Sequence, residues 1–471
     1  MHILLLLVTL AANLDSFVKQ AMAAAGTPAG LAVVVVQGDR VVYRGDFGFR
    51  DVEQKLPVTP ETRWYLGSTT KAFTAMAALV AAEEGKLDLD APVTQYWPEV
   101  KFTPPLDASR FSIRDFLAMR PGLGNATYNY RTGALANIDD DSELLRILAT
   151  YSSPQPRTFQ YSNMSYAFAA EILERATGRT WQELSAEKVF VPLGMTSTTS
   201  TVPPANVPVA QLYRSPEKGS FVRLEPKPDA AMSPAGGTFT TTGDAAKWLI
   251  AMLNDGRIGG KQALPKRPVR MAQAPQTVQK KRYHYFDRWG WGIGQDLGEY
   301  EGELLVHRFG GFKTAFSHTS FMPERRLGVA VFSNGGSAVA DAVAAYAYDV
   351  FLGKKNLDAK WSAELVKVAA AVQKQRDDWK RDIEIPLSTR GTPARPLEQY
   401  AGTYAYDRLG AMTISATGGK LFAQHGIARA ELVPKGGDEF QFDFSDAGEI
   451  DKLTFDEKGF VWGDRRFERV R

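Results

Sequence analysis

The sequence predicts an α/β protein of the α+β kind: a sheet with helices on both faces, followed by a small separate β-domain. Three observations predict this class. Strand-like runs stand at both ends of residues 30–352, and a mostly helical stretch lies between them. The last 75 residues alternate short β-branched or aromatic runs with glycine turns. A chain of 471 residues is also long for one hydrophobic core, so two domains are expected.

The first strands form a predicted hairpin. Residues 31–36 and 40–44 are rich in valine, and the Gly38-Asp39 pair between them favours a tight turn. Residues 31–36 are apolar at consecutive positions rather than alternate ones. We therefore expect helices to cover both faces of this strand.

Residues 68–84 predict a helix that ends at Gly85. Its apolar residues recur at intervals of three and four, at Phe73, Met76, Ala77, Val80 and Ala81. Residues 314–321 and 327–332 predict two late strands, and residues 338–352 a closing helix. The early and late strands thus frame a helical insertion in one discontinuous domain.

The C-terminal part begins with a charged amphipathic helix over residues 358–382. A linker rich in proline, glycine, serine and threonine follows at 386–396. We therefore divide the chain into a main domain over 13–353, a helix and linker over 354–396, and a small antiparallel β-barrel or sandwich over 397–471.

The N-terminus allows two interpretations. Residues 1–12 contain an apolar run of signal-peptide length that ends in small residues, although no Lys or Arg precedes it. The alternative is a buried first helix that continues through Leu14 and Phe17. We expect a signal peptide and a periplasmic or secreted protein, with a cytoplasmic one as the alternative. No later stretch is apolar and long enough to form a transmembrane anchor.

Composition excludes several function classes. The chain has no cysteine, which removes disulfides, thiol nucleophiles and thiolate metal sites. Its five histidines are scattered without metal-ligand spacing, so we expect no metal and no other cofactor. The net charge is only +3, and the densest basic cluster, Lys280-Lys281-Arg282, is interpreted as a solvated connecting loop. A nucleic-acid partner is therefore not expected.

The candidate nucleophile lies in Ser68-Thr-Thr-Lys71, an S-x-x-K motif. Residues three apart at the start of a helix share a face, so the Lys71 amine can reach the Ser68 hydroxyl. The helix N-terminus also suits an oxyanion beside Ser68. The motif alone is weak: it recurs at Ser185–Lys188 and Ser215–Lys218, and Ser68 read alone is more simply a helix cap.

Tyr161-Ser-Asn163 is the only Tyr-x-Asn in the chain. A tyrosine held near a lysine can have its pKa lowered and transfer protons, and Asn163 can donate to a substrate carbonyl. Taken alone, the tripeptide equally fits a packed tyrosine followed by an asparagine that caps the next helix.

Four motifs occur in order, and together they resemble the serine hydrolases related to class C β-lactamases, penicillin-binding proteins and D-Ala-D-Ala carboxypeptidases. The motifs occupy residues 64–76, 84–92, 159–166 and 191–196. The similarity spans about residues 14–352. It implies a serine β-lactamase-like fold, an antiparallel sheet flanked by helices plus a helical subdomain. It further implies Ser68 as nucleophile, Lys71 as its proton partner, Tyr161 as general base and Asn163 as a substrate contact.

The third family motif, Lys-Thr-Gly or His-x-Gly, is altered to His307-Arg-Phe-Gly-Gly311. Aligning the glycines places Arg308 at the basic position, followed by Gly310. Arg308 can bind a substrate carboxylate with two hydrogen bonds. His307 then points to the opposite face of the strand, as a core or supporting residue.

The resemblance also implies that the Gly311 amide completes an oxyanion hole with the Ser68 amide. The family's His-Thr-Ser-Gly-Leu loop is replaced by Met-Arg-Pro-Gly-Leu at residues 119–123. The C-terminal segment is similar to a lipocalin-like barrel that some members carry.

We therefore predict a serine hydrolase that forms an acyl-enzyme on Ser68 and cleaves small esters or amide bonds of D-residue peptides. The alternatives are a β-lactamase and a penicillin-binding or sensor protein that does not turn over. An assembly protein held by its C-terminal domain is a third. The expected partner is a small ester, peptide or lactam.

Overall fold

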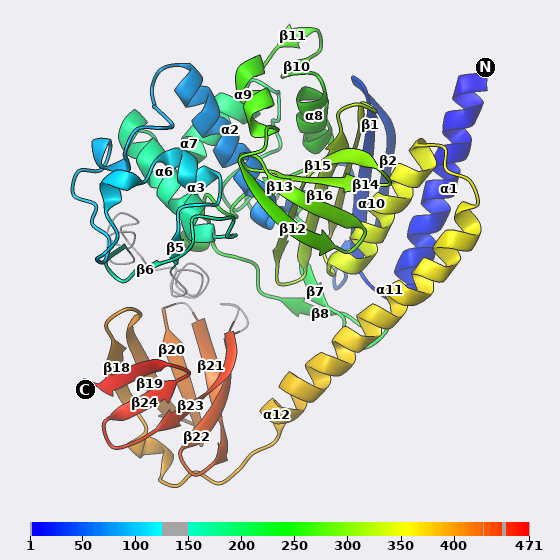
Figure 1. Cartoon of the computed structure of the whole chain (residues 1–471). Coiled ribbons are helices and arrows are strands. Elements are labelled where there is room, and N and C mark those ends of the chain that lie inside the picture. The colour runs from blue at the N-terminus through cyan, green and yellow to red at the C-terminus, as the bar shows by residue number, and fades with distance from the viewer. Residues whose placement is uncertain (1, 125–148, 427, 445–448, 471) are drawn as a thin grey trace.

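The computed structural model describes residues 2–124, 149–426, 428–444 and 449–470. Its centre is a nine-stranded antiparallel sheet in the order β12-β13-β14-β15-β16-β17-β1-β2-β3 (Figure 1). The strands are β1 (Gly30–Gln37), β2 (Arg40–Asp51), β3 (Leu56–Pro57), β12 (Thr277–Tyr283), β13 (Phe286–Trp291), β14 (Asp296–Tyr300), β15 (Glu303–Phe312), β16 (Ala315–Met322) and β17 (Leu327–Ser333). The first and last parts of this domain therefore share one sheet, and the helical residues between them form a separate layer.

The central strand β1 is covered on both faces, as its continuous apolar sequence predicts. It lies between β17 and β2, with Val33 opposite Val331 and Gly45. Val33 and Val35 belong to one hydrophobic core, and Val34 and Val36 to the other. Two separate cores thus lie on opposite faces of the same sheet.

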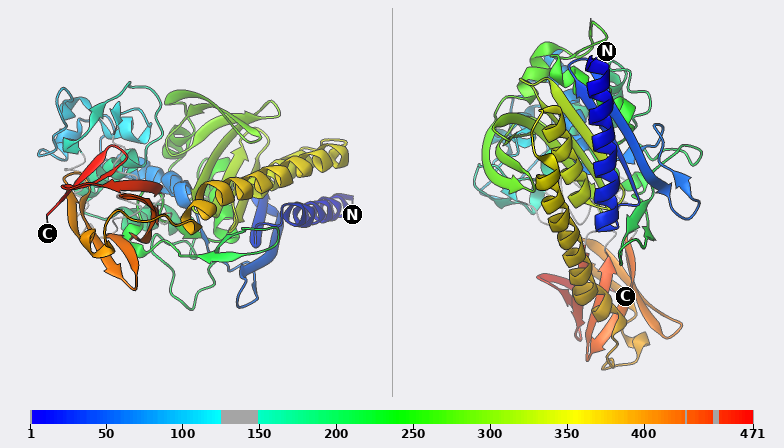
Figure 2. Two further views of the ribbon diagram at one scale, coloured as in Figure 1. Left: turned by 90° about the horizontal axis from the view of Figure 1, so that it is seen from below. Right: turned by 90° about the vertical axis from the view of Figure 1, so that its right-hand side faces the viewer.

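Three helices cover the back face, α1 (His2–Ala25), α10 (Ser337–Phe351) and α11 (Leu357–Trp379). Figure 2 shows α1 and α11 side by side along this face. Trp361 of α11 is buried and packs against Phe17 and Tyr346, and its indole N–H donates to Asp349 at 2.8 Å. Residues 2–25 form one helix, and among its described side chains, those from Thr9 onward, the fully buried ones begin at Leu14.

The front face carries the helical insertion. Its longer helices are α2 (Thr70–Glu83), α6 (Asn163–Thr177) and α8 (Thr242–Leu253), and its shorter ones are α3 (Ile113–Leu117), α7 (Trp181–Ser185) and α9 (Lys266–Ala272). Helix α2 begins two residues later than predicted, because residues 67–69 form a 3₁₀ turn. Helix α6 begins at Asn163, since the Ser162 side chain accepts a hydrogen bond from the Ser165 amide and caps the helix.

The interpretation of Lys280-Lys281-Arg282 as a loop is wrong. These residues lie in β12 at the edge of the sheet, with their side chains exposed, while neighbouring Gln279 is buried. Basic side chains are typical of edge strands, where they discourage pairing with other chains. The sequence signal was weak because little of this strand is apolar.

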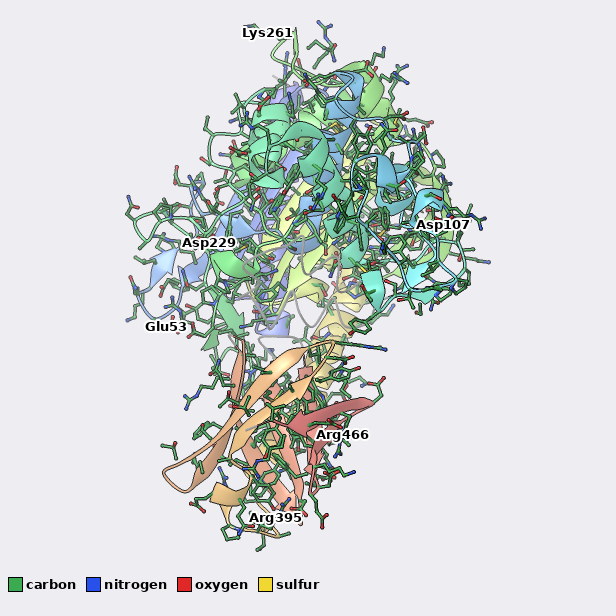
Figure 3. All side chains as sticks on the ribbon, turned by 90° about the vertical axis from the view of Figure 1, so that its left-hand side faces the viewer. Glu53, Asp107, Asp229, Lys261, Arg395 and Arg466 are labelled. Carbon is green, nitrogen blue, oxygen red and sulfur yellow. The ribbon has the colours of Figure 1, made fainter. Side chains whose placement is uncertain are left out.

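The C-terminal part is a closed eight-stranded antiparallel barrel. Its strands are β18 (Gly402–Tyr406), β19 (Gly410–Thr417), β20 (Lys420–His425), β21 (Ala428–Gly436), β22 (Glu439–Phe444), β23 (Glu449–Phe455), β24 (Gly459–Trp462) and β25 (Arg465–Arg469). Buried aromatic side chains such as Phe440, Phe460 and Trp462 pack in its interior. Figure 3 shows the barrel, with the labelled Arg395 and Arg466, below the larger unit.

Helix α11 leads into a π-helical turn at Lys380–Glu384, and α12 (Ile385–Ser388) follows it on the way to the barrel. A second contact joins the two units away from this connection: the Arg408 guanidinium, in the β18–β19 turn, lies 5.0 Å from the centre of the Tyr151 ring. Among the described residues, no helix is long and apolar enough to cross a membrane.

Trp361→Ala should lower the free energy of unfolding by about 3–5 kcal/mol, because it leaves a large cavity between α11, α1 and α10. Val366→Ala is the matched control on the same helix, since Val366 is 70% exposed and its loss should cost less than about 0.5 kcal/mol. Urea denaturation of the full chain measures both. Equal losses would contradict the described packing of α11.

Candidate active site

Ser68 lies in the 3₁₀ turn at Gly67–Thr69, just before α2. Two hydroxyls fix this turn to the sheet: Ser317 Oγ of β16 lies 2.8 Å from Thr69 Oγ1 and donates to the Leu66 carbonyl at 2.6 Å. Gly67 has φ +51°, a conformation that glycine adopts without strain. The serine is therefore held in a rigid turn at the N-terminus of a helix.

Gly310 allows β15 to approach this turn closely. A Cβ atom at Gly310 would lie 1.8 Å from the Leu66 carbonyl oxygen and 2.8 Å from the Ser68 amide nitrogen. A Cβ at Gly67 would likewise lie 2.8 Å from the Gly311 amide nitrogen. The two glycines thus allow the backbone of the Ser68 turn to approach that of Gly310 and Gly311 closely, as an oxyanion hole built from the Ser68 and Gly311 amides would require.

Lys71 lies one turn into the helical segment and is fully buried. Its Nζ donates to Ser68 Oγ at 3.1 Å, to Asn163 Oδ1 at 2.7 Å and to the Ala235 carbonyl at 2.7 Å. Three acceptors match the three protons of an ammonium group. Asn163 therefore contacts the lysine through its side-chain oxygen.

Tyr161 stands immediately before α6, and its hydroxyl lies 2.7 Å from Ser68 Oγ. The altered loop at residues 119–123 supports this segment, because the Gln160 amide donates to the Met119 carbonyl at 2.8 Å. Trp291 of β13 packs edge-on against the Tyr161 ring, with 6.3 Å between ring centres. The phenol is thus held beside the serine from two directions.

Arg308 is almost completely buried, and each guanidinium nitrogen has a protein acceptor. Nη2 donates to the Tyr161 hydroxyl at 2.9 Å, Nη1 to Asp296 Oδ2 at 2.7 Å, and Nε to the Ser68 carbonyl at 3.2 Å. The sequence predicted a carboxylate-binding arginine at this position. The geometry favours another role, in which Arg308 orients Tyr161 and the Ser68 turn.

The charges of these groups shift their pKa values. Burial lowers the pKa of Lys71 to about 8, with Arg308 adding to the effect and Tyr161 opposing it. Burial alone would raise the pKa of Tyr161, but the positive charges of Arg308 and Lys71 outweigh it and lower that pKa to about 8. The lysine and the phenol therefore titrate as a coupled pair near neutral pH.

His307 is fully buried on the opposite face of β15, where its ring lies 4.7 Å from that of Phe309. This confirms the interpretation as a core histidine. The other two S-x-x-K matches do not form sites of this kind. Ser185 is buried in α7, and Lys188 pairs with Glu84 at 2.7 Å. Ser215 donates to the Glu217 carbonyl in a loop.

Sequence reasoning missed three groups at the site. Asp296 of β14 holds Arg308, and the Ala235 carbonyl accepts from Lys71. Lys227 is a second lysine close enough to Lys71 to be repelled by it, and burial lowers its pKa to about 8. A backbone carbonyl leaves no mark in a sequence. Asp296 becomes a neighbour of Arg308 only once the register that pairs it with His307 is known.

A cavity of about 1,100 Å³ begins at this site. Tyr161, Arg308, Gly310 and Gly311 line one part of it. Other lining residues come from α11 and the barrel, including Trp379 and Ile450. The described barrel thus contributes to the walls of the cavity that contains the candidate base.

Comparison with known proteins identifies the family of the main domain. The family model described as Beta-lactamase matches residues 14–353. The chain belongs to this family. The unguisins hydrolase ungD' of Aspergillus campestris is 26% identical over 409 residues, which cover 82% of this chain and 74% of the relative. The family is a hydrolase family that acts on small molecules.

A bacterial relative and a solved structure are also similar to this chain. The protein flp of Staphylococcus aureus strain COL is 26% identical over 171 residues, which cover 36% of this chain and 34% of the relative. The octameric penicillin-binding protein homologue from Pyrococcus abyssi superposes with a TM-score of 0.64 at 22% identity. It covers 97% of this chain and 99% of that structure, so the shared fold includes the C-terminal barrel.

We expect one tyrosine to ionise near pH 8 when tyrosinate is followed by ultraviolet absorbance. Tyr161→Phe should remove this titration. Arg308→Gln should move it upward by at least about one pH unit, because the nearby cation that favours the phenolate is lost.

Tyr151→Phe is the control, since the pKa of Tyr151 is raised by the nearby charge of Asp407 and its loss should leave the titration near pH 8 intact. An unchanged titration in Tyr161→Phe would contradict the assignment.

Proposed function

We propose that this protein is a serine hydrolase that cleaves small esters or peptide amide bonds through an acyl-enzyme on Ser68. One observation carries the proposal: Ser68 Oγ lies between Lys71 Nζ at 3.1 Å and the Tyr161 hydroxyl at 2.7 Å, where the backbone of its turn approaches Gly310 and Gly311 closely. This arrangement combines a nucleophile, a proton acceptor and donors for an oxyanion.

The contacts support Tyr161 as the base of the first step. The neutral Tyr161 hydroxyl donates to Ser68 Oγ. When Tyr161 is ionised and Lys71 is an ammonium that donates to its three acceptors, the Ser68 hydroxyl can donate its proton to the Tyr161 oxygen at the same 2.7 Å contact. Arg308 donates to the same oxygen and favours its ionised form. Ser68 then attacks the carbonyl, its proton passes to Tyr161, and the Ser68 and Gly311 amides bind the oxyanion.

The second half of the reaction uses the same groups. Tyr161 gives its proton to the leaving alcohol or amine as the tetrahedral intermediate collapses to the acyl-enzyme. A water molecule then gives a proton to Tyr161 and attacks the acyl carbonyl, and the proton returns to Ser68 as the acid leaves. Neither half needs a group outside the protein and its substrate other than water.

The substrate proposal is the broad one of small esters and D-residue peptides. The name of the Aspergillus relatives, unguisins hydrolase, supports hydrolysis in general. A β-lactamase ranks lower, because Arg308 at the third motif is fully engaged with protein acceptors. A sensor that is acylated without turnover remains the second candidate, since the name of the Pyrococcus homologue is that of a penicillin-binding protein.

We also propose export to the periplasm or outside the cell, with removal of residues 1–12. Among the side chains of α1 that the structure describes, those from Thr9 onward, the fully buried ones begin at Leu14, so these remain after such a cut. The N-terminal sequence of the exported protein tests this, and an intact Met1 on protein found in the cytoplasm would contradict it.

Ser68→Ala should lower hydrolysis of p-nitrophenyl butyrate by more than about 10⁴-fold without loss of fold, because the nucleophile is gone. Ser185→Ala is the matched control at a second S-x-x-K and should keep wild-type rates. A stopped-assay time course and circular dichroism measure rate and fold. Equal rates in wild type and Ser68→Ala would refute the proposal, and a burst in wild type that stops at one equivalent would favour the sensor.

A further inference from the structure

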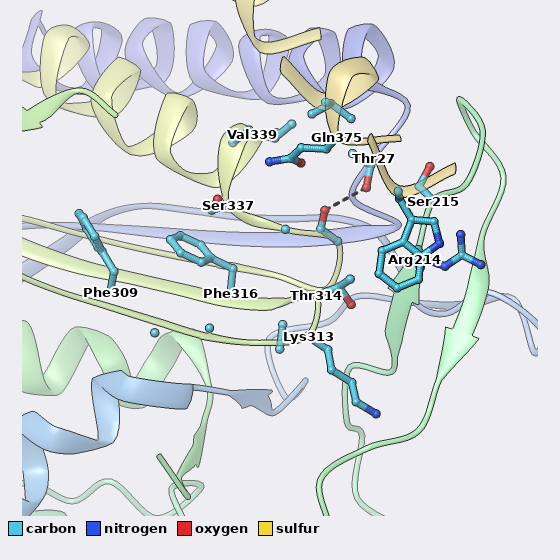
Figure 4. A pocket seen from close by; sticks show the side chains of 18 of the residues that line it. Thr27, Arg214, Ser215, Phe309, Lys313, Thr314, Phe316, Ser337, Val339 and Gln375 are labelled. Atoms are coloured by element: carbon cyan, nitrogen blue, oxygen red, sulfur yellow. Dashed lines mark hydrogen bonds between the residues drawn. The ribbon is translucent and has the colours of Figure 1, made fainter. Parts of the chain in front are cut away.

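The cavity at the active site extends beyond the reacting groups to the back face of the sheet. Strand β14 pairs with β15 only as far as His307, so among the described residues no strand lies beside 308–312 on that side. The cavity passes round this open end. Figure 4 shows Phe309 and Phe316 directed toward Val339 and Gln375, away from the front of the sheet.

The walls of this extension are apolar, but its charge is positive. The apolar side chains include Phe309, Phe316, Val339, Val372, Trp379 and Ile450. The cationic side chains that line the whole cavity are Arg214, Lys281, Arg288, Arg308, Lys313 and Arg376. Glu384 and Asp443 are the acidic ones. Such a cavity suits an elongated apolar chain that carries a negative charge.

Arg214 is the cation best placed to bind that charge. Its guanidinium stacks on Trp379 of α11 at 5.1 Å, and its Nη1 is buried without a hydrogen-bond partner among the described residues. The described carboxylates all lie beyond ion-pair distance of it. A buried, unsatisfied N–H is costly, so a ligand anion that accepts from it gains binding energy.

The other arginines are less available. Arg308 is fully engaged at the active site. Arg288 also has a buried nitrogen without a hydrogen-bond partner, its Nε, but Asp296 lies 3.6 Å from that atom and balances its charge, and the guanidinium stacks on Tyr283. Arg376 donates to the Ala25 and Ser215 carbonyls and to Ser215 Oγ, which fixes the strand segment next to Arg214. Arg376 therefore adds positive charge beside Arg214, while its Nε and Nη2 already donate to protein acceptors.

We propose that Arg214 anchors the carboxylate of an elongated substrate whose other end reacts at Ser68. This deepens the proposed function and rests on it: the substrate is a chain with an apolar body and a distal carboxylate. The chain runs from the Gly310–Gly311 edge of β15, past Phe309 and Phe316, to the part of the cavity that Arg214 and Trp379 line. The anion is thus recognised away from the third motif, where Arg308 is occupied.

The test uses straight-chain carboxylates from butanoate to decanoate and the matched primary amides as inhibitors of p-nitrophenyl butyrate hydrolysis. In wild type, the longer carboxylates should inhibit competitively and at least about tenfold more tightly than their amides, the ratio expected for one charged hydrogen bond. In Arg214→Gln, the inhibition constant of each amide divided by that of its carboxylate should fall toward one. Arg223→Gln is the matched control, an exposed arginine that pairs with Asp51 at 3.5 Å outside the cavity.

Equal inhibition by carboxylates and amides in wild type, or a ratio unchanged in Arg214→Gln, would overturn the proposal. Non-competitive inhibition that depends on Arg214 would overturn the substrate assignment. Calorimetric binding of decanoate to Ser68→Ala tests the anion site separately from the proposed hydrolase function. If wild type shows no Ser68-dependent hydrolysis, the proposed function fails. The anion site is then tested by the double variant Ser68→Ala, Arg214→Gln: loss of decanoate binding supports the site, and unchanged decanoate binding refutes it.

Discussion

The Arg308 guanidinium joins the parts of the molecule on which the site depends. Through its three nitrogens it contacts β14 at Asp296, the segment before α6 at Tyr161 and the turn before α2 at Ser68. These segments lie far apart in the chain and belong to the sheet and to the helical layer. A buried cation of this kind is stable only while its partners stay in place, so the contact ties the position of the phenol to the register of the sheet.

The Arg308 guanidinium also affects the pKa values of Lys71 and Tyr161. Desolvation raises the pKa of a phenol and lowers that of an amine, so without other charges the phenol would remain protonated and the amine would lose its proton. Burial and Arg308 lower the pKa of Lys71 to about 8, and Arg308 and Lys71 lower that of Tyr161 to about 8 against the effect of desolvation. The Ser68 hydroxyl lies between the two groups. The heavy atoms need not move for the proton to pass from serine to tyrosine. Preorganisation of this kind is the main contribution that a protein makes to acyl transfer without a cofactor.

The central strand and most of the candidate catalytic residues were predictable from sequence, because the sequence patterns that indicate them are local. The valine run at 31–36 predicts a strand covered on both faces, and the spacing of Ser68 and Lys71 predicts two side chains on one helical face. Aligning the Gly310–Gly311 pair placed Arg308 at the basic position of the third family motif, and the resemblance implied a role for the Gly311 amide. The resemblance of four ordered motifs added Tyr161, which its own tripeptide does not single out.

The features that sequence did not reveal depend on register or on tertiary packing. Strand β12 carries three exposed basic residues, so its period-two pattern is masked by charge. The role of Arg308 depends on Asp296, which becomes its neighbour only through the pairing of β14 with β15. The extension of the cavity to Arg214 requires the positions of α11 and the barrel. None of these relations is encoded in a short window of residues.

The central claim is that Ser68 carries the acyl group, and intact-mass and peptide mass spectrometry after rapid acid quench test it most directly. With p-nitrophenyl butyrate, the quenched protein should gain the mass of one butyryl group, located on the peptide that contains Ser68 and absent from Ser68→Ala. A butyryl group on another residue, or turnover with no covalent intermediate on Ser68 at any quench time, would contradict the account.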